Sequence, residues 1–471
     1  QGYELADGTV LNEPLEAGHK VALSDIKSGE AVIKYGNLIG YATADIHRGD
    51  HVHVHNIRTS LGDNEGYTYT PELEELPALA ADWFQGYLRE DGSAGVRNEI
   101  WIIPTVGCVN SVVRKMESEA KKFISGSLED IIAFNHPYGC SQMGDDQENT
   151  REILADLIRH PNAGAVLVVG LGCENSSIDE IKKYLGDYDP ERVAFMVCQQ
   201  HDDEVSYGLE LLEKLSEYAK RFHREKLPVS KLVIGLKCGG SDGLSGISAN
   251  PVVGRFSDFL IAKGGSTILT EVPEMFGAER LLMNRCVNEA VFDKTVDLIN
   301  DFKDYYRENH QTIYENPSPG NKKGGISTLE DKSNGCIQKS GSATVMDVLA
   351  YGEIIRTKGL NLLSAPGNDL VASTALAASG AQIVLFTTGR GTPFASPVPT
   401  VKISSNTPLY EKKRNWIDFN AGELLDNDEI TLDQMGQKLY DLVMETASGR
   451  LVRSEQDGYH DLAIFKKGVT L

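Results

Sequence analysis

The stretch KLVIGLKCGGSDGLSGISANP, residues 231–251, joins a buried-strand pattern to a loop rich in small and reactive side chains. The apolar run 232–236 is followed by Cys238, two glycines, Ser241 and Asp242. This order predicts a short buried β-strand that enters a tight turn. The glycines let a ligand approach the backbone closely, and a thiol, a hydroxyl and a carboxylate lie beside it. A strand-to-helix turn without a ligand is the alternative interpretation.

The same order of strand, polar loop and helix recurs along the chain and predicts an α/β fold with largely parallel, Rossmann-like sheets. Strands are expected at 100–106, 131–134, 165–169, 193–197, 232–236, 267–270, 360–363 and 383–387. We expect two α/β lobes, at 96–228 and 229–471, because the polar stretch HREKLPVSK interrupts the alternation. Residues 61–95 contain prolines and glycines without a sustained period and are predicted to be a linker.

The first residues, 1–60, are predicted to form a small all-β module, because short apolar segments alternate with glycine turns. Its last predicted strand reads HVHVHN and directs His51, His53 and His55 to one face. Three imidazoles on one face, with His19 from a GHK turn as a further candidate, can bind a metal or an anion. A solvated face of an edge strand is the alternative.

Composition limits the classes of function. A net charge of −22 without a basic patch argues against nucleic-acid binding, and an anionic substrate would need a local group of cations. The chain has no apolar run of about 18 residues and no signal-peptide pattern near its start, so no membrane span or secretion is expected. Seven cysteines do not indicate a disulfide framework, and we expect a reducing cytoplasm.

Reactive side chains follow most of the predicted strands, at the edge where parallel sheets bind ligands. Five of the seven cysteines lie at these strand ends or just after them: Cys108, Cys140, Cys173, Cys198 and Cys238. Each can be a buried small residue, but their shared position favours one site. The glycine-rich segments 319–325 and 387–393 add cations suited to carboxylate or phosphate groups. No P-loop, strand-linked GxGxxG, CxxC or HExxH occurs, so a metal site must be assembled from distant loops.

A series of longer motifs closely resembles the altronate/galactarate dehydratase family, which carries an N-terminal SAF (β-clip) module. The motifs are GHKVALSDI (18–26), VIKYGNLIGYATADI (32–46), HVHVHN (51–56), GVRNEIWIIPTVGCVN (95–110), NHPYGCSQ (135–142), GLGCEN (170–175), CGGSDGLSGISANP (238–251), NPSPGNKKGG (316–325) and TTGRGTP (387–393). The resemblance runs to the closing LAIFKKGVTL (462–471). HVHVHN and the GCSQ context favour altronate over galactarate as the substrate.

The resemblance implies a hydro-lyase of hexuronate (galacturonate) catabolism that converts D-altronate to 2-dehydro-3-deoxy-D-gluconate and water. It implies a divalent metal, usually iron(II), with manganese(II) as another choice. A Lewis-acid cation on the carboxylate would stabilise the charge that develops when the α-proton leaves. A positioned base and acid would contribute roughly 10²–10⁴-fold each.

On this resemblance, metal ligands are expected among His53, His55, His136, Cys140, Cys173 and Cys238. The expected catalytic groups are His136, Cys140, Asp242 and Glu271. Substrate contacts are expected from His19, Asn135, Glu174, Ser241, Lys322, Lys323, Arg390 and Thr392.

Three alternatives stay open at this point. An iron–sulfur cluster could use Cys108, Cys140, Cys173 and Cys238, because cluster dehydratases use an open iron as the Lewis acid. The substrate could be a related sugar acid such as galactarate. A chain of another class would bind a sugar acid without turnover. Assembly into a homo-oligomer, and whether the module covers its own chain or a neighbour, are also left open.

Overall fold

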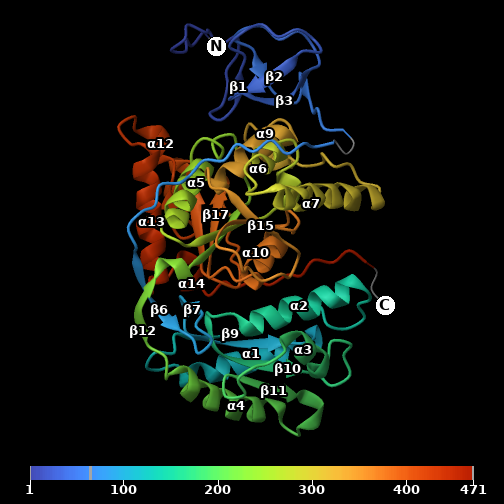
Figure 1. Cartoon of the computed structure of the whole chain (residues 1–471), viewed down its shortest axis with the longest axis vertical. Helices are drawn as coiled ribbons and strands as arrows, with labels where there is room; N and C mark the ends of the chain where they lie inside the picture. Colours follow the sequence, from blue (N-terminus) through green and yellow to red (C-terminus); the bar gives the residue numbers. More distant parts are fainter. Residues whose placement is uncertain (1, 63–65, 469–471) are drawn as a thin grey trace.

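The computed structural model describes residues 2–62 and 66–468. The predicted module, linker and second lobe also include residues 1, 63–65 and 469–471, which lie outside the described residues. Three bodies follow one another along the long axis of the molecule: the N-terminal module, the body built on the largest sheet, and a smaller α/β body (Figure 1). No helix among the described residues combines the length and apolar character needed to span a membrane.

The central body is a seven-stranded parallel sheet in the order β15-β16-β14-β13-β17-β18-β19. Its strands are β13 Val233–Cys238, β14 Ser266–Leu269, β15 Val345–Leu349, β16 Gly359–Leu363, β17 Ile383–Thr388, β18 Thr400–Ser404 and β19 Phe419–Asn420. Every residue of β13, β14, β16, β17 and β18 is buried, as expected for a parallel sheet covered on both faces. The chain moves from β13 to β14 on one side and later returns to β17 on the other. The loops after β13 and β17 therefore meet at a topological switch point, where such sheets bind ligands.

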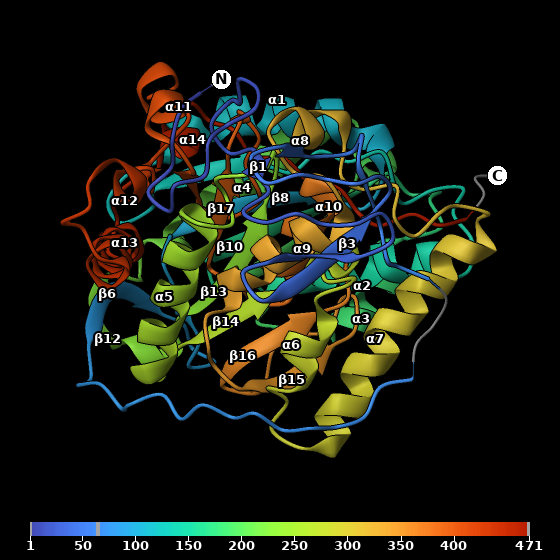
Figure 2. The same cartoon turned by 90° about the horizontal axis from the view of Figure 1, so that it is seen from above.

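Helices cover both faces of this sheet. Helices α5 (Ala249–Ala262) and α13 (Leu432–Ala447) pack together on one face, and α10 (Asp369–Ala378) lies on the other. The remaining helices of this body are α6 Glu279–Met283, α7 Glu289–Glu308, α8 Pro319–Lys323, α9 Leu329–Cys336, α11 Thr407–Lys412, α12 Glu423–Asp426 and α14 Arg453–Gln456. In the view from above, the N-terminal module lies over α8 and α9 (Figure 2).

The smaller body has a four-stranded parallel sheet in the order β11-β10-β8-β9. Its strands are β8 Glu99–Pro104, β9 Asp130–Ala133, β10 Ala163–Gly170 and β11 Val193–Val197. Helices α1 (Asn110–Ala120) and α4 (Glu204–Ala219) pack on one face, and α2 (Asp145–Arg159) and α3 (Ile178–Leu185) on the other. Helix α2 also packs against α10 of the central body. The predicted α/β class with parallel sheets is confirmed.

A third sheet lies where these two bodies meet. Strands β6 (Trp83–Leu88), β7 (Ala94–Gly95) and β12 (Arg224–Pro228) pair in antiparallel fashion. Two of the three strands therefore lie in the segment predicted to be a linker. Exposed and buried residues alternate over the first four positions of WFQGYL, a signal so short that a longer window averages it away.

The N-terminal module pairs β1 (Lys20–Val21) with β4 (His51–Val52), and β2 (Ala31–Lys34), β3 (Asn37–Ala42) and β5 (Ile57–Arg58) form a second small sheet. The prediction that HVHVHN is one continuous strand is wrong, because the strand ends at Val52. Asn56 causes the turn: its amide donates to the His51 carbonyl at 2.8 Å, and its side-chain oxygen accepts from the His53 backbone N–H at 3.0 Å.

Lys20 and Lys34 attach the module to the central body. Their ammonium groups lie 2.7 and 2.8 Å from the carboxylate of Asp331, which is on α9. The Thr328 hydroxyl, at the start of the same helix, donates to the Ile39 carbonyl of β3 at 2.6 Å. The module is therefore held on its own chain by specific polar contacts.

Candidate functional site

The loop after β13 begins at the centre of the sheet, with Cys238 as the last residue of the strand and only 1% exposed. Gly239 follows, and a Cβ at that position would lie 2.4 Å from the Phe386 ring and 2.6 Å from a carboxylate oxygen of Asp369. Only glycine fits such a close approach. The loop that follows the Cys238 thiol therefore lies directly against the Asp369 carboxylate at the switch point.

Cys238, Glu274 and Cys336 form a buried group of potential metal ligands. A carboxylate oxygen of Glu274 lies 3.1 Å from the Cys238 Sγ and 3.0 Å from the Cys336 Sγ, and the two sulfurs are 3.5 Å apart. The three side chains come from β13, the 3₁₀ turn Val272–Glu274 and the end of α9. Two thiolates and a carboxylate are a donor set for a transition metal such as iron(II) or zinc(II).

Charged side chains surround this group and balance one another, and all of them except Asp369 are buried. They are the ammonium groups of Lys237, Lys332 and Lys339 and the carboxylates of Glu271, Glu274 and Asp369. Lys332 lies 2.7 Å from Glu274, Lys339 lies 3.1 Å from Glu271, and Lys237 bridges Glu271 and Asp369. Because these charges cancel, a dication that displaces the protons of the two thiols leaves the local net charge unchanged. The residues present thus fit a divalent metal.

The protonation states agree with this assignment. Burial disfavours the charged form of Glu274, but Lys332 and the neighbouring ammonium groups hold its pKa well below the ordinary value. The hydrogen bond with Cys238, together with burial, raises the pKa of the Cys336 thiol well above its ordinary value. Glu274 is therefore ionised, and the Cys336 thiol keeps its proton until a cation displaces it.

An open cleft of about 580 Å³ leads to the buried group. Cys238, Glu274 and Lys332 lie on its wall with Lys322 and Asp369. Its volume lies in the range of about 300–1,000 Å³ that is usual for small-molecule sites. Two ammonium groups near a metal-ligating set suit a small anion such as a carboxylate.

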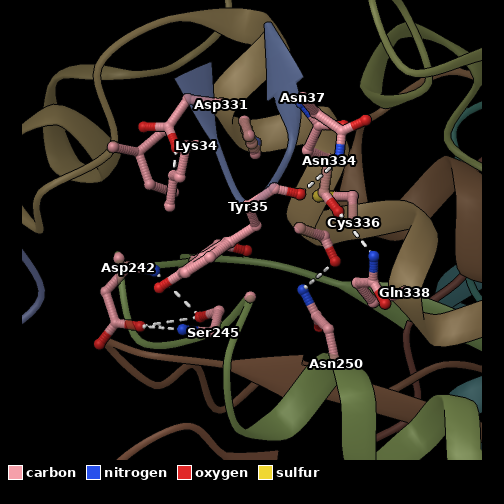
Figure 3. A pocket seen from close by; sticks show the side chains of 16 residues that line it. Lys34, Tyr35, Asn37, Asp242, Ser245, Asn250, Asp331, Asn334, Cys336 and Gln338 are labelled. Atoms are coloured by element: carbon pink, nitrogen blue, oxygen red, sulfur yellow. Dashed lines mark hydrogen bonds and ion pairs between the residues drawn. The ribbon is translucent and has the colours of Figure 1, made fainter. Parts of the chain in front are cut away.

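A second, smaller cavity of about 110 Å³ lies beneath the β2–β3 hairpin of the module. Figure 3 shows the ring of Tyr35 extending from the hairpin toward Asp242 and Ser245. The Asp242 carboxylate accepts from Ser245 Oγ at 2.8 Å, Ser405 Oγ at 2.8 Å and Asn406 Nδ2 at 3.1 Å. Ser241 also lines this cavity. Asp242 and Ser241, predicted as site residues, thus lie against the module, and the contacts of Asp242 hold a turn.

Glu271 has a left-handed backbone conformation, with φ 70°, and its side chain is fully buried. Its carboxylate accepts from Lys237, from Lys339 and from the Cys238 backbone N–H at 2.9 Å. These contacts hold the end of β13 and two of the buried ammonium groups in place. Glu271 thus has a positioning role, in addition to the catalytic role that the sequence predicts.

The predicted residues of the smaller body lie at the ends of its own sheet. His136 Nε2 is 2.7 Å from the Pro104 carbonyl and its Nδ1 accepts from the Tyr138 N–H at 3.2 Å, so both ring nitrogens have partners. Burial lowers the pKa of His136 to about 4. Cys140 and Cys173 are exposed. In the part of the chain that the structure describes, no compact group of three metal-ligating atoms includes His136, Cys140 or Cys173.

The other predicted contacts have separate surroundings. Glu174 accepts from the Thr105 hydroxyl at 2.7 Å and the Gly172 N–H at 2.6 Å, which braces its own loop. The side-chain oxygen of Asn135 is buried without a hydrogen-bond partner. Thr392 accepts from the Phe394 N–H at 3.2 Å, within the same turn. A Cβ on Gly240 would lie 3.6 Å from the Arg390 Cβ, so Arg390 lies beside the β13 loop.

Lys322 and Lys323, which are adjacent on α8, take part in different contacts. Lys322 lines the cleft, whereas the backbone carbonyl of Lys323 lies 3.3 Å from His19 Nε2 of the module. His19, His51 and His53 form a second group of potential metal ligands. His55 extends this group, with its ring centroid 5.4 Å from that of His51.

Sequence reasoning selected Cys238 and Glu271 but missed Glu274, Cys336 and the buried lysines. Glu274 was recognisable in EVPE, three residues after Glu271 and just beyond a strand. Lys237 was recognisable as a charge between the apolar run 232–236 and Cys238, because lysine is rarely buried without a partner. Cys336 follows no predicted strand, so the rule of reactive strand ends could not find it.

Comparisons with known proteins cover nearly the whole chain. Three family models match: "Altronate/galactarate dehydratase SAF domain" at residues 2–60, "D-galactarate dehydratase/Altronate hydrolase, second domain" at 86–220, and "D-galactarate/Altronate dehydratase, C-terminal" at 229–470. An altronate dehydratase of Bacillus subtilis (strain 168) is 56% identical over 98% of this chain and 93% of its own length.

Two relatives from Escherichia coli (strain K12) extend the comparison. An altronate dehydratase is 54% identical over 99% of this chain and 97% of its own length. A galactarate dehydratase (L-threo-forming) is 33% identical over 98% and 92%, respectively. With the three domain models in order along the sequence and full-length relatives at this level of identity, the chain belongs to the altronate/galactarate dehydratase family.

Proposed function

We propose that this chain is a metal-dependent hydro-lyase that converts D-altronate to 2-dehydro-3-deoxy-D-gluconate and water. The observation that carries the proposal is the buried Cys238–Glu274–Cys336 group, which opens into a cationic cleft at the switch point of the sheet. Altronate is favoured over galactarate because the two altronate dehydratases are 56% and 54% identical to this chain, against 33% for the galactarate enzyme.

Cys238, Cys336 and Glu274 would hold iron(II). When bound, the metal supplies a Lewis acid for the negative charge that develops on the substrate during proton removal. Two sulfur donors favour iron(II) over manganese(II), which prefers oxygen ligands. Because Cys238 lies with Cys336 and Glu274, the mononuclear site accounts for its surroundings better than a cluster shared with Cys140 and Cys173.

The residues of the cleft have separate proposed roles in binding and proton transfer. Lys322 and Lys332 would bind the substrate carboxylate, since both line the cleft and Lys332 is held in place by Glu274 at 2.7 Å. Lys332 remains an ammonium at neutral pH because, although burial opposes its charge, Glu274 raises its pKa well above the ordinary value. Its charge therefore stabilises the enediolate that forms when the α-proton leaves.

Asp369 is the proposed base. Its side chain is 34% exposed at the cleft and lies 2.9 Å from Lys237, which fixes its orientation. It would take the proton from C2, and the same carboxyl would return a proton to the hydroxyl leaving C3. The C2–H and C3–O bonds break, water departs, and the resulting enol rearranges to the 2-keto acid.

The test compares cysteines of the same burial. Cys336→Ser and Glu274→Gln should lower bound iron and turnover of D-altronate by more than about 100-fold, because even indirect supports of a metal are worth about 10–100-fold. Cys286→Ser is the matched control, because Cys286 is buried but contacts Thr295 instead of the metal-ligand group. Iron is measured by elemental analysis after anaerobic loading, and the 2-keto-3-deoxy product by mass spectrometry.

Unchanged iron and turnover in Cys336→Ser would refute the proposed centre. A panel of altronate, galactarate and other hexonates tests the substrate assignment separately. Faster turnover of galactarate than of altronate would overturn the altronate assignment while leaving the metal centre in place.

A further inference from the structure

Three histidines of the N-terminal module face one another. The ring centroids of His19, His51 and His53 are 5.0, 5.2 and 5.2 Å apart in the three pairs. One ring nitrogen from each lies within 4.8 Å of the others. His19 comes from the turn before β1, and the other two come from β4 and the turn after it, so three separate backbone positions converge on one point.

Hydrogen bonds fix which nitrogen of His19 carries its proton. His19 Nε2 lies 3.3 Å from the Lys323 carbonyl, which can only accept, so the proton of His19 belongs on Nε2. Its Nδ1 then accepts from His51 Nε2–H at 2.9 Å, so a cation that enters the group takes the place of this proton and His51 keeps its own proton on Nδ1. Metal-binding histidines characteristically donate their second N–H to a carbonyl in this way.

His53 supplies the second independent observation. Its Nδ1 atom is buried and has no hydrogen-bond partner. A buried polar atom without a hydrogen-bond partner lowers the stability of the fold by about 1–3 kcal/mol. A cation bound to His53 would give this imidazole a partner that the described part of the protein does not supply.

We propose that the module binds one divalent transition-metal ion through His19, His51 and His53, at a site separate from the Cys238–Glu274–Cys336 centre. Neutral imidazoles without carboxylates favour zinc(II), nickel(II), copper(II) or iron(II) over magnesium and calcium. His55 is exposed and lies beside the site, with its ring centroid 5.4 Å from that of His51.

The site is built into the contact between the module and the central body. A Cβ on Gly243 would lie 1.9 Å from the Gly18 carbonyl oxygen, and one on Gly325 would lie 2.4 Å from the same atom. The turn that carries His19 therefore lies directly on the backbone beside α8. An ion bound to His19 fixes this turn and the Lys323 carbonyl, next to Lys322 at the cleft. Its effect on catalysis would therefore be on the KM for the substrate carboxylate more than on kcat.

Cobalt(II) distinguishes the two sites, because thiolate ligands give an intense near-ultraviolet charge-transfer band and imidazoles do not. The protein is stripped with a chelator and titrated anaerobically with cobalt(II), and bound metal is counted by elemental analysis. Wild type should bind two equivalents. The double variant Cys238→Ser, Cys336→Ser should bind one equivalent, with visible d–d bands but no thiolate band.

Adding His53→Ala to that double variant should abolish the remaining equivalent, and His51→Gln should weaken it by at least about 10-fold, in line with the loss of a ligand. His47→Ala is the matched control, because His47 is in the same module and 65% exposed, beside Asp25. In the otherwise wild-type chain, His53→Ala should bind one equivalent and keep the thiolate band.

Failure of the cysteine double variant to bind cobalt(II), or retention of the ion after His53→Ala, would overturn the histidine site. Binding of a single equivalent by wild type, with loss of that equivalent and its thiolate band in His53→Ala, would also overturn it, because the histidines and cysteines would then share one centre. The proposed dehydratase reaction is tested separately, by turnover in Cys336→Ser.

Discussion

Asp331→Asn tests how the N-terminal module is held on the central body. Asp331 accepts from Lys20 at 2.7 Å and Lys34 at 2.8 Å, and its side chain is 1% exposed. The same carboxylate accepts from the Ser327 N–H at 2.9 Å. Asparagine keeps the size and one acceptor oxygen but removes the charge, so both ammonium groups lose their counter-ion.

The magnitude follows from burial. Breaking a buried ion pair from one side costs about 3–5 kcal/mol. Lys20 and Lys34 keep 12% and 22% of their side chains exposed, so both can turn partly toward water. The lower value of about 3 kcal/mol therefore applies, which shifts the equilibrium between docked and released module by about 100-fold. The module has its own core of seven buried apolar side chains, and the substitution leaves this core intact.

Hydrogen exchange followed by mass spectrometry measures this shift. Amide protons of β3 and α9, on the two sides of the contact, should exchange about 100-fold faster in Asp331→Asn, while those of β10 stay unchanged. Asp45→Asn is the matched control, because its ion pair with Lys27 is exposed at 63% and 49% and should have no measurable effect. Equal exchange of α9 in Asp331→Asn and wild type would refute the reasoning.

The same contact has a predictable pH dependence. Burial alone would raise the pKa of Asp331, but Lys20 and Lys34 hold it well below its ordinary value of 3.8. Docking free energy from this group is therefore fully present above pH 3.8 and is lost as the pH falls below it toward the folded-state pKa. The Asn variant should lack this acid step. Two further predictions concern the start of β8, where the smaller body contacts α14 of the central body. Arg97→Met should lower the free energy of unfolding by about 3–5 kcal/mol in chemical denaturation, because it leaves Glu455 buried without the partner that lies 2.6 Å away. An unchanged free energy of unfolding would show that stability does not depend on this pair. Burial raises the pKa of Glu99 to about 8, so folding takes up a proton between pH 4.5 and 8. The free energy of unfolding therefore falls with rising pH in this range, by up to about 1.4 kcal/mol per pH unit. Glu99→Gln should flatten this slope, and an unchanged slope would contradict the prediction.

Local pattern was sufficient for most of the fold. The β11 strand was predicted at its observed bounds, and the strands β8, β9, β10, β13, β14, β16 and β17 were each predicted to within a few residues. Buried parallel strands are continuous apolar runs, which any short window detects. Strands β15, β18 and β19 were missed, because VMDVL and TVKIS carry polar residues and β19 has only two residues.

The sequence by itself determined the family, the α/β class, and the position of Cys238 and Glu271 after neighbouring strands, because these depend on residues close in the chain. Only the tertiary structure decided that Cys238 pairs with Cys336, 98 residues away, and with Glu274, instead of with Cys140 or Cys173. Packing of distant segments sets those distances, and no local period encodes them. The same holds for the histidines: alternation predicted a shared face, but the turn at Asn56 and the docking of His19 on Lys323 placed their nitrogens around one point.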